Sequence, residues 1–75
     1  MAKFRMDVDQ KRYFCTLCSE GRITRAAQSL YLSRQGLSKS MKSLESQLGA
    51  QLFVRGKKGV ELTAAGRILL RYLHE

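Results

Sequence analysis

The chain has 75 residues, enough for one small domain with a thin hydrophobic core. Its 14 Lys and Arg residues outnumber its 6 Asp and Glu residues and give a net charge of +8, so nucleic acid is the first partner to consider. The sequence contains no membrane span, export signal or cysteine-rich disulfide framework, so we expect a cytoplasmic protein with no membrane contact.

Two helices are predicted in the first part of the chain. The first spans residues 7–20 and ends at Gly21, and its apolar stripe consists of Val8, Phe14, Leu17 and Cys18. The second is short, covering residues 25–30 with Thr24 as its N-cap. Ala26 and Ala27 in this second helix allow it to pack closely against a neighbouring helix.

The third predicted helix has the clearest periodicity in the sequence. It follows a brief turn at residues 31–32 and begins after Ser33, which is a good N-cap. Its apolar positions recur at helical spacing, at Leu37, Met41, Leu44 and Leu48. Gly49 then supplies a residue that can adopt a left-handed backbone and end the helix.

A small β-hairpin and a last helix follow. Leu52 and Phe53 begin a short strand, residues 56–59 form a turn, and residues 60–62 alternate as a second strand would. Thr63 then caps a helix with one apolar stripe, formed by Ala65, Ile68, Leu69, Tyr72 and Leu73, while Leu70 lies on another side. No stop signal precedes Glu75, which favours a chain cut within a longer protein over a helix that a partner covers.

Three helices followed by a basic hairpin is the order of a mainly α winged helix-turn-helix, with a three-helix core and a short two-stranded β wing. An ordinary three-helix bundle is the alternative, because small residues and leucines occur in both. The face of helix 33–48 opposite its apolar positions favours DNA binding, since it is polar or basic and carries no acidic side chain. Its outward residues are Gln35, Lys39, Lys42 and Ser46, with Ser38 and Ser43 beside them.

These residue types suit the major groove of DNA. Gln and Lys can read base edges, Ser can contact a base or a phosphate, and Arg34 near the helix start can reach guanine or the backbone. The hairpin adds Arg55, Lys57 and Lys58, which can follow the phosphate backbone or enter the minor groove. A solvated polar face is the alternative reading, but such faces usually mix charges of both signs.

The run from Met6 to Arg67 resembles the N-terminal DNA-binding domain of LysR-type transcriptional regulators. The matching pieces include the segment GRITRAA at residues 21–27, Leu32-Ser33, Leu44-Glu45, Leu48-Gly49, Leu52-Phe53 with Arg55, and Val60 to Thr63 with Gly66. The resemblance implies that bases are read by Arg34, Gln35, Ser38 and Lys39. It also implies backbone contacts from Thr24, Arg25, Lys42 and Arg55.

The same resemblance implies a division of the chain at residue 62. Residues 1–62 would form the DNA-binding domain, and residues 63–75 would begin a linker helix through which the protein forms a homodimer. A small-molecule effector would bind only through a domain absent from this chain. The sequence departs from the family at Arg34-Gln35-Gly36, where Gln, then Pro or Ser, then Ala are usual, and at Lys11 in place of Leu. The base preference therefore does not transfer.

Other chemistries are less well supported. Cys15 and Cys18 form a Cys-x-x-Cys pair, but with His74 as the one histidine we expect no metal site. We interpret both thiols as packing residues, with redox sensing as the alternative. No nucleophile with a histidine base and no catalytic carboxylate pair is visible, so we expect neither an enzyme nor a cofactor. A winged-helix protein-interaction module or an RNA binder remains an alternative, although the basic outward face and the few aromatic residues favour neither.

Overall fold

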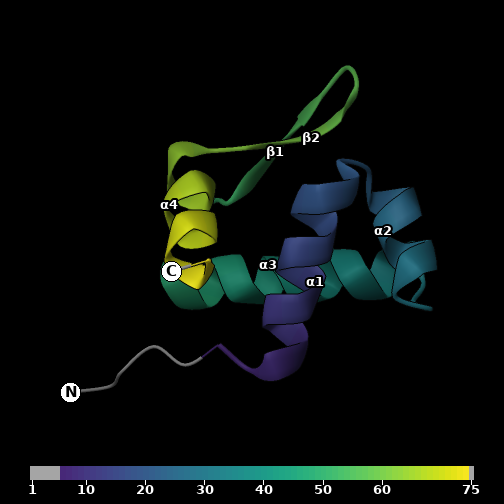
Figure 1. Cartoon of the computed structure of the whole chain (residues 1–75), viewed down its shortest axis with the longest axis horizontal. Coiled ribbons are helices and arrows are strands. Elements are labelled where there is room, and N and C mark those ends of the chain that lie inside the picture. The colour runs from purple at the N-terminus through teal and green to yellow at the C-terminus, as the bar shows by residue number, and fades with distance from the viewer. Residues whose placement is uncertain (1–5, 75) are drawn as a thin grey trace.

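The computed structural model describes residues 6–74 and contains four helices and one two-stranded sheet (Figure 1). In chain order the elements are α1 (Val8–Glu20), α2 (Ile23–Ser29), α3 (Arg34–Leu48), β1 (Phe53–Gly56), β2 (Gly59–Leu62) and α4 (Ala64–Leu73). This is the mainly α winged helix-turn-helix that the sequence predicts. The hairpin β1–β2 is called the wing below.

The hydrophobic core lies where α1, α2 and α3 meet. Its buried members are Phe14, Leu17, Ala26, Ala27, Leu30, Leu37, Met41, Leu44 and Leu52. Ala26 and Ala27 are buried in α2, as expected for a short helix in close contact with its neighbours. In Figure 1, α1 crosses α3 near its middle, α2 lies beside the start of α3, and α4 lies beside its end. The ring of Phe14 also meets Phe53, with centroids 5.4 Å apart, so the wing is joined to the helical core.

The predicted ends of α1 and α3 are confirmed, whereas the predicted start of α2 is wrong. Ser33 accepts a hydrogen bond from the Gly36 N–H at 3.0 Å, and Gly49 ends α3 with a φ of 70°. The N-cap of α2 is Arg22 rather than Thr24. Gly21 ends α1 in a left-handed conformation, which leaves Arg22 extended and lets its carbonyl oxygen accept the first bond of the helix, from Ala26.

The wing is an antiparallel pair of short strands. Phe53 pairs with Leu62 and Gly56 with Gly59, so Lys57 and Lys58 form the connecting turn. The first strand begins at Phe53, one residue later than predicted. Leu52 is instead a core residue, only 1% exposed, whose backbone N–H donates to Glu45 rather than to the sheet.

The last helix begins after Thr63, as predicted, but its apolar stripe is divided between the core and the solvent-exposed surface. Ala65, Leu69 and Leu73 pack against the core together with Leu70, whereas Ile68 is 69% exposed and Tyr72 is 71% exposed. The closest approach of α4 to the core is at Gly66, where a Cβ would overlap the carbonyl oxygen of Leu52. Gly66 and Leu70 thus lie on the face of α4 that packs inward, while Ile68 and Tyr72 face outward.

Candidate nucleic-acid interface

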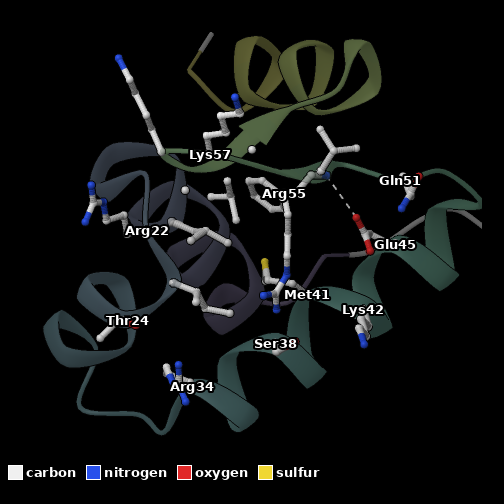
Figure 2. A pocket seen from close by; sticks show the side chains of 18 residues that line it. Arg22, Thr24, Arg34, Ser38, Met41, Lys42, Glu45, Gln51, Arg55 and Lys57 are labelled. Atoms are coloured by element: carbon white, nitrogen blue, oxygen red, sulfur yellow. Dashed lines mark hydrogen bonds between the residues drawn. The ribbon is translucent and has the colours of Figure 1, made fainter.

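A groove of about 670 Å³ runs between α3 and the wing (Figure 2). Residues of α3 line one wall, residues 53–60 line the other, and the start of α2 closes one end. Figure 2 shows Arg55 reaching from the wing across the groove towards α3, while Lys57 points away from α3. The groove thus has basic side chains on both walls.

The fold brings together most of the residues that the sequence singles out for DNA binding. Seven of the ten line the groove, namely Thr24, Arg34, Ser38, Lys42, Arg55, Lys57 and Lys58. Five of these seven are cationic and come from α3 or the wing. Residues separated by more than 20 positions in the sequence therefore share one surface.

The other three predicted residues lie outside this groove. Gln35 and Arg25 are exposed on α3 and α2. Lys39 is exposed on another flank of α3, where it lines a smaller hollow with Asp7 and Asp9 at the start of α1. The outward face of α3 is therefore wider than the groove, and its two flanks differ in charge.

Two further polar residues line the groove, and the sequence analysis did not predict either of them. Arg22 lies at the end formed by the start of α2, and Gln51 lies in the segment that leads into β1. Arg22 follows the helix-ending Gly21 directly, and that position is a signal that the next helix starts two residues earlier than Thr24 suggests. The position of Gln51 has no comparable local signal.

The acidic residue of the groove, Glu45, is occupied by hydrogen bonds. One carboxylate oxygen, Oε2, accepts from the backbone N–H of Leu52 at 2.7 Å and of Phe53 at 3.2 Å. Part of this interaction is drawn in Figure 2. Because these N–H groups carry partial positive charge, they offset the negative charge of the carboxylate within the basic surface.

The far end of the wing is joined to the turn between α1 and α2. The Val60 N–H donates to the carbonyl oxygen of Gly21 at 3.0 Å. Gly59 has a φ of 133°, and a Cβ at this position would overlap the same carbonyl oxygen. Only glycine meets both conditions, so the wing can lie directly against the helical turn.

Outside the groove, the cysteines and the potential metal ligands of the described residues do not form a second site. Cys15 and Cys18 are free, half-buried thiols that pack against the core, as predicted. Burial, together with the adjacent Cys15, raises the pKa of Cys18 to about 11. Within residues 6–74 no group of three or more metal-ligating side chains is present, and no helix has the length and apolar character to cross a membrane.

Comparison with known proteins identifies the family. Residues 8–67 match the model of the bacterial regulatory helix-turn-helix protein, lysR family. The chain belongs to this family. It is 40% identical over 65 residues to the HTH-type transcriptional regulator TfdT of Cupriavidus pinatubonensis, which covers 87% of the chain and 28% of TfdT. Identity to the regulator XapR of Escherichia coli is 45% over 67 residues, which covers 89% of the chain and 23% of XapR.

Solved structures of LysR-family proteins share the fold. The DNA-binding domain of CbnR, crystallised with DNA, is 35% identical with a TM-score of 0.85, covering 92% of this chain and 79% of that one. The DNA-binding domain of BenM on benA site 1 DNA is 33% identical with a TM-score of 0.85, covering 92% and 80%. The chain spans about a quarter of the length of its curated relatives. It is therefore a LysR-type winged helix-turn-helix DNA-binding domain, as its sequence predicts.

Proposed function

We propose that the domain binds double-stranded DNA with α3 in the major groove and the wing on the backbone or in the minor groove. The observation that carries this geometry is the groove between α3 and the wing. Six cationic side chains line it, Arg22, Arg34, Lys42, Arg55, Lys57 and Lys58, and its one acidic group is hydrogen-bonded. The DNA-bound relatives support the same use of the fold.

The residues divide into two roles. Arg34, Gln35, Ser38 and Lys39 lie on α3 and carry the donors and acceptors that read base edges. Thr24, Arg25, Lys42 and the wing residues Arg55, Lys57 and Lys58 contact phosphates, to which we add Arg22 from its position in the groove. Activity rests on binding rather than catalysis, which is supported by the family, whose members are transcriptional regulators.

The proposal also covers the division of the chain and the formation of a dimer. Residues 1–62 form the DNA-binding unit, and α4 begins a linker helix through which two copies form a homodimer. Support comes from the exposed apolar side chains of Ile68 and Tyr72 and from the greater length of the relatives. A regulator of this family acts on the bacterial chromosome in the cytoplasm, and any small-molecule effector binds to a part of the protein outside this chain.

Fluorescence anisotropy tests the DNA geometry. The chain should bind a duplex more tightly than a single strand, and its affinity should fall steeply with salt. Arg55→Ala and Lys42→Ala should weaken binding, and each should reduce the slope of log affinity against log salt by about 1. Lys11→Ala is the matched control, since Lys11 is an exposed cation on α1 that does not line the groove. An equal loss from Lys11→Ala and Arg55→Ala would contradict the model.

A further inference from the structure

Three elements of the fold meet at the peptide groups of Leu52. Its N–H donates to Glu45 on α3, and its carbonyl oxygen accepts from the Thr63 N–H at 3.0 Å, at the base of the wing. The same carbonyl oxygen lies against Gly66 of α4. Leu52 itself is buried, so these backbone groups have little access to water and depend on their protein partners.

Glu45 is the side chain that joins the recognition helix to this junction. It lies in the last turn of α3, three residues after Lys42. Its carboxylate accepts hydrogen bonds from the N–H groups of Leu52 and Phe53, at the entry to the wing. The opposite end of the wing is held by the bond from Val60 to Gly21. Hydrogen bonds therefore tie the wing to α3 and to the turn between α1 and α2, in addition to the contact of Phe53 with Phe14 of α1.

We propose that Glu45 is a positioning residue for DNA binding, which holds the wing at the separation from α3 that a duplex requires. This inference rests on the proposed function, because it assumes that α3 and the wing contact one duplex. With the wing fixed, Arg55 and Lys42 face the DNA without a cost for ordering the wing at the moment of binding. Without the carboxylate, the N–H groups of buried Leu52 and half-buried Phe53 lose their acceptor and the wing entry is free to move.

An electrostatic role and a positioning role of Glu45 predict opposite changes in DNA affinity when its carboxylate is removed. A carboxylate beside bound DNA repels phosphates, so its loss by charge alone should strengthen binding. If Glu45 instead holds the wing, its loss should weaken binding even though the net charge becomes more positive. The direction of the change therefore separates the two explanations.

The experiment measures duplex affinity by anisotropy for a series of variants. Glu45→Ala should bind about tenfold more weakly, as for the loss of a coupling of ordinary size. Glu45→Gln should bind like the parent chain, because its amide oxygen can accept the same N–H groups. Glu45→Asp keeps the charge but is one CH₂ shorter, and it should also weaken binding. Glu61→Ala is the matched control, an exposed carboxylate of β2 whose removal makes the same change in charge.

A double-mutant cycle with Arg55→Ala tests the mechanism directly. In the parent chain Arg55→Ala should weaken binding, whereas in the Glu45→Ala background it should have less than about a twofold effect. Hydrogen exchange provides an independent reading, since the amides of Leu52 and Phe53 should exchange faster in Glu45→Ala while those of α1 and α3 stay protected. If Glu45→Ala does not fold, the same cycle and exchange measurement are made with Glu45→Asp.

The outcomes distinguish the two levels of the proposal. Unchanged or tighter binding by folded Glu45→Ala, or a full Arg55→Ala effect in that background, would overturn the positioning role and leave the DNA geometry intact. No effect of Arg55→Ala in the parent chain would instead contradict the proposed function itself.

Discussion

Tyr31 is an unusual residue in the turn between α2 and α3. Its backbone is left-handed, with a φ of 57°, and its side chain is 94% exposed. A left-handed backbone is costly for residues other than Gly, Asn and Asp, because the Cβ approaches the following carbonyl oxygen. Because the tyrosine ring is exposed, its packing contacts do little to offset this cost. The turn that joins the two helices therefore carries local strain.

Replacing Tyr31 by Asn should raise the free energy of unfolding by about 0.5–1 kcal/mol, because Asn adopts the left-handed region more easily. Urea denaturation followed by circular dichroism measures the change. Tyr72→Asn serves as the control, since Tyr72 is also largely exposed but has a helical backbone, and its replacement should not stabilise the fold. Equal effects of the two substitutions would show that the backbone at Tyr31 is not strained.

The Cys18 thiol predicts a dependence of stability on alkaline pH. Burial, with a smaller contribution from Cys15, raises the pKa of Cys18 to about 11 in the folded chain, whereas an unfolded cysteine ionises near ~8.5. The contribution to stability is complete below about pH 8.5 and is lost as the pH rises towards 11, because the unfolded state releases its proton first. Urea denaturation should therefore show that the free energy of unfolding of the parent chain, relative to that of Cys18→Ala, is lower at pH 10.5 than at pH 7. A constant difference would contradict the raised pKa.

Residue positions on α3 illustrate what sequence reasoning can reach. A helical wheel predicts which side chains of α3 point outward, and Gln35, Lys39 and Lys42 are indeed exposed. It does not say what lies opposite each flank. Lys42 faces the wing, whereas Lys39 faces the acidic start of α1, because the packing of α1 and of the wing around α3 is set by contacts distant in sequence.

At the scale of elements, α4 depends on one hydroxyl group at its start. Thr63 Oγ1 accepts from the Gly66 N–H at 3.0 Å and donates to the carbonyl oxygen of Gln51. The first bond caps the helix, and the second joins it to the segment before the wing. Thr63 therefore connects α4 to the base of the wing through its side chain as well as its backbone.

Thr63→Val should lower the free energy of unfolding by about 1–2 kcal/mol, because it removes an N-cap and leaves the Gln51 carbonyl oxygen without its donor. Thr63→Ser retains the hydroxyl and should lose much less. Thermal or urea denaturation compares the three proteins. A loss from Thr63→Ser as large as that from Thr63→Val would mean that the methyl group, rather than the hydroxyl, stabilises this end of the helix.

The elements that local rules predict well are those with local signals. Ser33, Thr63 and Gly49 define the ends of α3 and the start of α4, and all three are confirmed. The predicted start of α2 was wrong, and the single apolar stripe predicted for α4 is divided between the core and solvent. Arg22 is placed by the left-handed end of α1, and α4 packs through Gly66 against Leu52, which is 14 residues away in sequence.

For the molecule as a whole, the exposed face of α4 predicts self-association. Ile68 and Tyr72 are both largely exposed, one turn apart on the helix. Sedimentation equilibrium should show a concentration-dependent dimer, and the pair Ile68→Glu and Tyr72→Glu together should abolish it. Val8→Glu is the control, because Val8 is also largely exposed but lies on α1. A monomer at all concentrations would contradict dimer formation through α4 alone.

The contact between Gly59 and Gly21 has a consequence for how such a domain diversifies. The frame of the wing is held by backbone atoms at the Gly21 end and by Glu45 at the other, and neither tie uses the side chains of Lys57 or Lys58. Lys57 and Lys58 can therefore be exchanged without loss of the contacts that hold the wing, and in the proposed DNA geometry such an exchange changes the general attraction to phosphates. In the proposed DNA geometry the bases are read from α3, so affinity and sequence preference depend on different residues and can evolve one at a time.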